Sequence, residues 1–127
     1  MELYGTADWK KEKHVPVIEV PEVIKKGERT TVTVSVGKEI PHPNKTEHHI
    51  RWIKLMFWPE GEKYPVEIGV IEFNAHGESI KGPDTGTIYT EPYGVFSFKT
   101  EKAGKLIATS YCNIHGLWIN EKEVKVE

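Results

Sequence analysis

A cysteine and a histidine three positions apart are the residues of this chain with the clearest capacity for chemistry. Cys112 is the only cysteine among 127 residues, and His115 follows it in the sequence Cys-Asn-Ile-His. A thiolate and an imidazole on one loop can bind the same metal ion, and zinc, copper and iron all accept imidazole. Three more histidines, His14, His42 and His48, lie in expected loops or at expected strand starts. Spacing alone leaves open whether they share one metal or are simply solvated.

The backbone around His42 favours a fixed position for its side chain. Pro41 and Pro43 flank this histidine, and both restrict the backbone. A residue held in this way loses little entropy on binding a ligand. The two remaining histidines, His49 and His76, are expected to lie outside any metal site. The side chain of His49 should point to the opposite face of its strand from that of His48. His76 lies in a glycine-rich loop, where we expect it to be solvated.

Composition limits the classes of function. The formal net charge is −2 and no basic cluster is evident, so we expect no nucleic-acid partner. No apolar run approaches the roughly 18–20 residues that span a bilayer, so we expect no membrane partner. The first ten residues lack the apolar core of a signal peptide. A single cysteine cannot form an internal disulfide, and together these features favour a cytoplasmic protein in a reducing compartment.

The pattern of apolar residues predicts an all-β chain. Residues 30–36 alternate β-branched apolar and polar side chains, which is typical of a strand with one buried face. Residues 123–127 are expected to form a short edge strand. The full set of expected strands is 15–20, 30–36, 50–58, 66–73, 88–90, 95–99, 106–111 and 123–127. This set favours an immunoglobulin-like antiparallel β-sandwich of about seven strands, formed by residues 1–127 as a single domain. Because a sandwich gathers its loops at two ends, loop residues that are distant in sequence can meet there.

Three segments resemble a known family. Residues 12–16 (Glu-Lys-His-Val-Pro), 42–50 (beginning His-Pro-Asn) and 112–118 (Cys-Asn-Ile-His-Gly-Leu-Trp) resemble the signature segments of superoxide reductases. These proteins are also called neelaredoxins and correspond to the catalytic domain of desulfoferrodoxins. The resemblance extends over nearly the whole chain, including residues 8–9 and 75–79. The order of the three motifs makes the resemblance specific.

The resemblance implies one non-haem iron per chain, held in a square pyramid. Its equatorial nitrogens would come from His14, His42, His48 and His115, and its axial thiolate from Cys112. The family reaction is the one-electron reduction of superoxide to hydrogen peroxide, which consumes two protons. The chain resembles the one-iron class, because no Cys-x-x-Cys pair precedes the first of these histidines.

Two charged residues before the first histidine also match the family. Glu12 corresponds to a carboxylate that binds the sixth position of the oxidised iron, and Lys13 to a lysine that attracts superoxide. Without the resemblance, Lys13 would be one solvated lysine in a run of charged residues. The resemblance further implies an external, rubredoxin-like electron donor and a homotetramer.

Three other functions fit parts of the pattern. A blue-copper electron carrier also has a cysteine and a histidine on a late loop of a β-sandwich, but usually adds an axial methionine just after it, and residues 116–127 contain none. A structural zinc site takes four ligands and keeps no open position, which fits poorly with five candidate ligands and a carboxylate. A superoxide dismutase needs a metal that also oxidises superoxide, and the sequence does not set the reduction potential.

Overall fold

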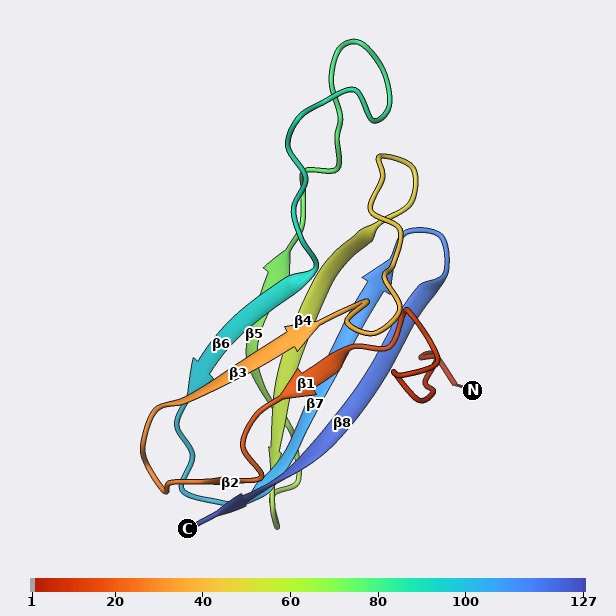
Figure 1. Cartoon of the computed structure of the whole chain (residues 1–127). Helices are drawn as coiled ribbons and strands as arrows, with labels where there is room; N and C mark the ends of the chain where they lie inside the picture. The colour runs from red at the N-terminus through yellow and green to blue at the C-terminus, as the bar shows by residue number, and fades with distance from the viewer. Residues whose placement is uncertain (1) are drawn as a thin grey trace.

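Two β-sheets pack face to face in the computed structural model, which describes residues 2–127 (Figure 1). The smaller sheet has the strand order β1-β3-β6, and the larger has the order β2-β8-β7-β4-β5. The strands are β1 (Val17–Glu19), β2 (Val23–Ile24), β3 (Thr30–Ser35), β4 (Ile50–Pro59), β5 (Val66–Glu72), β6 (Tyr93–Phe98), β7 (Gly104–Cys112) and β8 (Gly116–Val126). No helix in the described part of the chain is long and apolar enough to cross a bilayer.

The core lies between the sheets and follows from alternation along the strands. Val32 and Val34 on β3 are fully buried, as are Ile53 and Leu55 on β4. Successive side chains of a strand point to opposite faces, so residues two positions apart lie on the same face. In β3 and in β4 this shared face points toward the other sheet and forms the core. The all-β sandwich expected from the sequence is therefore confirmed.

The last strand differs from the prediction. Residues 123–127 were expected to form a short edge strand, but β8 is 11 residues long and lies inside its sheet, between β7 and β2. The cause is a tight turn after β7, in which Cys112 pairs directly with Gly116. Gly116 has a φ of 84°, a conformation that glycine adopts without steric cost, so the chain reverses at once and pairs along the whole of β7.

Two shorter segments also differ from the prediction. Val23–Ile24 forms β2, which pairs parallel to β8 and is too short to produce a periodic signal in the sequence. The expected strand at 88–90 is reduced to an isolated bridge between His76 and Tyr89. Neither difference alters the two-sheet architecture.

Strand register brings the candidate residues to one end of the sandwich. The start of β1 lies beside the end of β3, because Val17 pairs with Ser35. The start of β4 lies beside the end of β7, because Ile50 pairs with Cys112. The segment before β1, the β3–β4 connection and the β7–β8 turn therefore meet at the same end of the molecule.

Candidate metal centre

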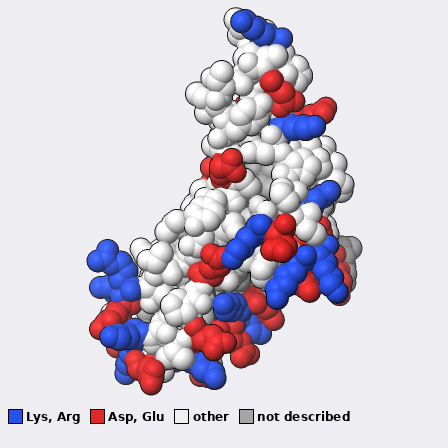
Figure 2. Space-filling view, in the orientation of Figure 1, with Lys and Arg blue, Asp and Glu red and all other residues white. Residues whose placement is uncertain are grey.

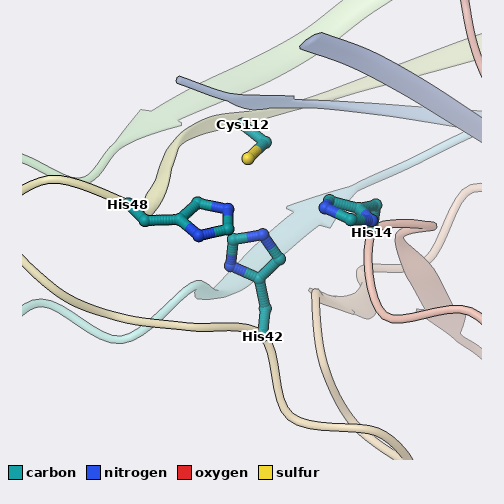
Figure 3. Close-up of side chains that lie close together, drawn as sticks. All are labelled: His14, His42, His48 and Cys112. Carbon is teal, nitrogen blue, oxygen red and sulfur yellow. The ribbon is translucent and has the colours of Figure 1, made fainter. Parts of the chain in front are cut away.

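Four of the predicted ligands converge at this end of the sandwich (Figure 3). His14 lies just before β1, His42 and His48 lie on the β3–β4 connection, and Cys112 is the last residue of β7. Their ligand atoms all lie within 4.8 Å of one another. Figure 3 shows the three imidazole rings around a common point, with the sulfur on one side of it. These four side chains therefore lie close enough together to bind one metal ion.

His115 completes a closed circuit of imidazoles. The ring centroids are 4.8 Å apart for His14 and His42, and 4.9 Å apart for His42 and His48. The circuit closes through His115, at 5.0 Å from His48 and 4.7 Å from His14. Nε2 of His14 lies 3.2 Å from Nδ1 of His115. Neighbouring nitrogens in a square around a metal at about 2.1 Å would be about 3 Å apart, so this spacing suits two ligands of one ion.

Three imidazole nitrogens in residues 2–127 are buried without a hydrogen-bond partner. Two of them, Nε2 of His42 and Nε2 of His48, belong to the histidine circuit, and the third, Nε2 of His76, lies outside it. For the two in the circuit, the surroundings show what could satisfy them. Nδ1 of His42 lies 2.6 Å from the carbonyl oxygen of Pro43, which can only accept a hydrogen bond, so Nδ1 carries the proton and Nε2 presents a lone pair. An unsatisfied buried polar group costs about 1–3 kcal/mol. A metal ion would satisfy both nitrogens, so these residues fit the group that the family resemblance implies.

The same two histidines are held in the form that binds metals. Burial lowers the pKa of His42 to about 4, outweighing the hydrogen bond to Pro43. Burial also lowers the pKa of His48, with a smaller contribution from the neighbouring His115. Both rings are therefore neutral near pH 7, as a metal-bound imidazole must be.

The sulfur of Cys112 is enclosed and hydrogen-bonded. The residue is fully buried, and its Sγ accepts a hydrogen bond from the backbone amide of His115 at 3.3 Å. Among the hydrogen bonds of the described residues, the amide of His115 is the one backbone amide that donates to this sulfur. Such a bond withdraws charge from a thiolate and tunes the potential of a metal bound to it.

Glu12 lies behind one ring of the circuit. Its carboxylate is 2.7 Å from Nδ1 of His14 and also accepts a hydrogen bond from the His14 backbone amide at 3.1 Å. Burial opposes ionisation of this carboxyl, but the hydrogen bonds from His14 outweigh it, and the pKa of Glu12 is lowered. A carboxylate on the outer nitrogen of a histidine fixes the ring and directs the other nitrogen inward. In this structure, Glu12 therefore orients His14.

Lys13 is half-buried beside the histidine circuit. Its positive charge adds to the lowering of the pKa of His42 and of His48, in each case after burial and neighbouring histidines. It forms no ion pair with any other residue in the range 2–127.

The expectation that His76 is solvated was wrong, and His49 is also buried. The two residues are 3% and 4% exposed, and their rings stack at a centroid distance of 3.4 Å. Nε2 of His49 accepts a hydrogen bond from Arg51, and Nδ1 of His76 lies 3.5 Å from the carboxylate of Glu78. Each ring is stacked on a histidine from a segment distant in sequence, which sequence spacing cannot show. Neither residue is among the four whose ligand atoms converge.

Residues 74–90, here called the clasp loop, hold the β3–β4 connection in place. In Figure 1 this loop extends from the same end as the metal-site loops. The amide of Thr46 donates to Oδ1 of Asp84 at 2.9 Å, and the amide of Asp84 donates to Oγ1 of Thr46 at 3.0 Å. The side chain of Asn44 adds a bond of 3.0 Å to the carbonyl of Thr90. The clasp loop thus fixes the segment between His42 and His48.

We expect Asp84→Ala to loosen this connection. The variant loses the bond to the Thr46 amide, and Asp84 has a φ of 55°, which disfavours alanine. The free energy of unfolding should fall by about 1–2 kcal/mol, measured by denaturant titration. Asp84→Asn is the matched control, since it keeps the acceptor oxygen and tolerates this backbone conformation. Equal losses in both variants would show that the reciprocal bonds are not the cause.

Comparison with known proteins agrees with this geometry. The family model described as desulfoferrodoxin matches residues 6–121. The chain is 60% identical to the superoxide reductase of Pyrococcus furiosus over 94% of each chain, and 52% identical to the neelaredoxin of Megalodesulfovibrio gigas over 99% of this chain and 97% of that protein. The solved superoxide reductase (neelaredoxin) from Archaeoglobus fulgidus in the reduced form has 62% identity and a TM-score of 0.92, covering 98% of this chain and 99% of that one. The expected immunoglobulin-like sandwich is thereby confirmed. The chain belongs to the desulfoferrodoxin family.

Proposed function

We propose that this chain is an oxidoreductase that reduces superoxide to hydrogen peroxide at one non-haem iron. The balanced reaction joins one superoxide, one electron and two protons to give one hydrogen peroxide. The observation that carries the proposal is the closed circuit of four imidazoles with a buried cysteine sulfur beside it. The relatives named superoxide reductase support the choice of substrate.

The proposed ligands are the Nε2 atoms of His14, His42 and His48, Nδ1 of His115 and Sγ of Cys112. When bound there, iron would supply the single electron, with its electron density raised by the thiolate. The chain holds the imidazoles of His42 and His48 neutral, which leaves the cation its positive charge, and it provides one enclosed sulfur, which water does not reach. The hydrogen bond from the His115 amide holds that sulfur in place.

The donor set favours iron over the two other metals that the sequence left open. A blue-copper centre needs three strong ligands and a weak axial one, usually methionine. Met56 pairs with Ile107 on β7, whereas the site lies at the Cys112 end of that strand, about 16 Å away at about 3.3 Å per residue. A closed tetrahedral zinc site would leave one of the five donors unused.

Metal analysis of the protein purified without oxygen tests this assignment. The protein is expressed with iron available, and iron, copper and zinc are measured per chain. We expect about one iron for each chain. Stoichiometric copper or zinc that iron reconstitution does not displace would contradict the proposal.

Glu12 is proposed to act in two positions. In the structure it orients His14, and the family resemblance implies that the same carboxylate binds the oxidised iron as a sixth ligand. A carboxylate is a hard donor suited to the ferric ion. Binding there requires the carboxylate to leave Nδ1 of His14.

We expect Glu12→Ala to change the ferric absorption spectrum while leaving the rate of the first reaction with superoxide nearly intact. Glu12→Gln separates the two positions, because the amide oxygen still accepts from Nδ1 of His14 but is not an anionic ligand. The glutamine variant should therefore retain iron better than the alanine variant and share its altered spectrum. Absorption spectra of the oxidised proteins measure the ferric spectrum, pulse radiolysis measures the rate, and metal analysis measures the iron retained. A native ferric spectrum in both variants would remove Glu12 from the ligand set.

The electron is proposed to come from a separate protein. The chain has one cysteine-containing site, and the family resemblance favours a rubredoxin-like donor. The same resemblance favours a single-domain protein, residues 1–127, that forms a homotetramer. On the face shown in Figure 2, acidic and basic side chains are intermixed, and the formal net charge is −2, which supports neither a nucleic-acid nor a membrane partner. The single, unpaired cysteine supports a cytoplasmic location.

A further inference from the structure

One tryptophan touches two of the proposed ligands. The indole ring of Trp118, on β8, stacks on the imidazole of His14 with a centroid distance of 4.8 Å and an interplanar angle of 13°. Its Nε1 donates a hydrogen bond to the carbonyl oxygen of His115 at 3.2 Å. The same side chain therefore contacts the ring of one proposed ligand and the backbone of another.

The N-terminal segment holds this tryptophan from a further direction. Gly5 forms a parallel bridge with Trp118: its amide donates to the carbonyl of Leu117 at 2.9 Å, and its carbonyl accepts from the amide of Ile119 at 2.9 Å. A Cβ atom placed on Gly5 would lie 2.8 Å from the Trp118 ring. The backbone of Gly5 and the indole are thus in direct contact, with no room for a side chain between them.

The stacking on His14 and the hydrogen bond to the carbonyl of His115 each restrain the motion of a proposed ligand. Glu12 holds the edge of the His14 ring at Nδ1, with its two carboxylate oxygens at 2.7 and 3.2 Å, but contacts made at one ring atom allow the ring to tilt about that atom. Stacking against Trp118 fixes the plane of the ring as well, so that Nε2 is directed at the circuit. His115 lies exposed in a tight turn, and the indole N–H secures the carbonyl of that turn.

We propose that Trp118 is a positioning residue that sets the plane of His14 and the conformation of the His115 turn, and that Gly5 keeps it there. This inference rests on the proposed ligand set. It predicts that Trp118 determines metal affinity through two separable contacts, the aromatic face and the N–H group.

Binding of Co²⁺ to the metal-free protein tests the proposal without relying on iron or on activity. Co²⁺ bound by a thiolate gives a charge-transfer band that reports both occupancy and geometry. Trp118→Leu removes both contacts and should raise the dissociation constant by about 10-fold or more. Trp118→Phe keeps an aromatic face but loses the N–H donor, so about a threefold rise is expected. Gly5→Ala crowds the indole, and its dissociation constant for Co²⁺ should lie between those of the native protein and Trp118→Leu.

Trp52 provides the matched control. It is half-buried on β4 and stacks on Tyr111, at a centroid distance of 6.0 Å, rather than on a proposed ligand. Trp52→Leu should bind Co²⁺ with native affinity and spectrum. Thermal unfolding of each metal-free variant separates loss of fold from loss of positioning. If Trp118→Leu does not fold, Trp118→Phe and Gly5→Ala still carry the test.

Two results would overturn the proposal in different ways. Native affinity and an unchanged Co²⁺ spectrum in Trp118→Phe and Gly5→Ala, or in a folded Trp118→Leu, would show that the tryptophan only packs. Absence of a thiolate band in the native protein would reject the ligand set itself, and the positioning role with it.

Discussion

Replacing Cys112 by serine is expected to abolish the sulfur-to-iron charge-transfer absorption and to weaken iron binding by more than about 100-fold. The estimate follows because even residues that only hold a ligand account for about 10–100-fold in affinity, and Cys112 is proposed to be a ligand itself. A serine hydroxyl is not ionised near pH 7, so the buried site loses its negative charge and its one soft donor. Absorption spectroscopy and iron release to a chelator measure the two effects.

Thr109→Val is the matched control for Cys112→Ser. Thr109 is buried on the same strand, and its hydroxyl has no hydrogen-bond partner within residues 2–127, so its replacement alters the interior of β7 without touching a proposed ligand. This variant should keep the native spectrum and iron content. Persistence of the charge-transfer band in Cys112→Ser would disprove thiolate ligation.

Replacing Lys13 by alanine is expected to slow the second-order reaction with superoxide by about 10-fold or more. Superoxide is a small anion, and a favourable local potential raises the association rates of such ions by about 10–10³-fold. The charge of Lys13 already acts on His42 and His48, so it lies close to the proposed site. The variant should also lose much of the dependence of the rate on ionic strength, since salt screens the attraction. Pulse radiolysis at several salt concentrations measures both quantities.

Lys11→Ala removes the same charge two positions away. Lys11 is exposed and belongs to the same run of charged residues, so it controls for net charge alone. Its loss should change the rate much less than the loss of Lys13. Equal effects of the two variants, or an unchanged rate and salt dependence in Lys13→Ala, would exclude a specific role for Lys13.

The fold was predictable where a strand has one buried face. β3 and β4 alternate clearly, because Val32, Val34 and Leu55 fill the core while their neighbours face outward. β8 was predicted only at its end, because burial along it does not alternate cleanly and its position inside the sheet depends on the turn at Gly116. β2 is held by two paired residues, and its parallel pairing with β8 depends on tertiary contacts.

The residues of the candidate centre were predictable because their types carry the chemistry. A lone cysteine and histidines in loops can be recognised in a sequence as possible metal ligands. Strand register then brings them together. The residues that hold them do not stand out in this way. The hydrogen bond between Thr46 and Asp84 joins residues 38 positions apart. Trp118 and His14 lie near opposite ends of the chain, and their rings come into contact only when the chain folds. Contacts of this kind depend on long-range packing, which periodicity and spacing do not encode.

The stoichiometry of the reaction with superoxide tests the central proposal most directly. The protein is loaded with iron, fully reduced, separated from reductant and mixed with less than one equivalent of superoxide without oxygen. Hydrogen peroxide and molecular oxygen are then measured. We predict one hydrogen peroxide for each superoxide consumed, one iron oxidised and no oxygen released. Release of one oxygen for every two superoxide ions would indicate a dismutase, and no reaction would contradict a catalytic role for the site.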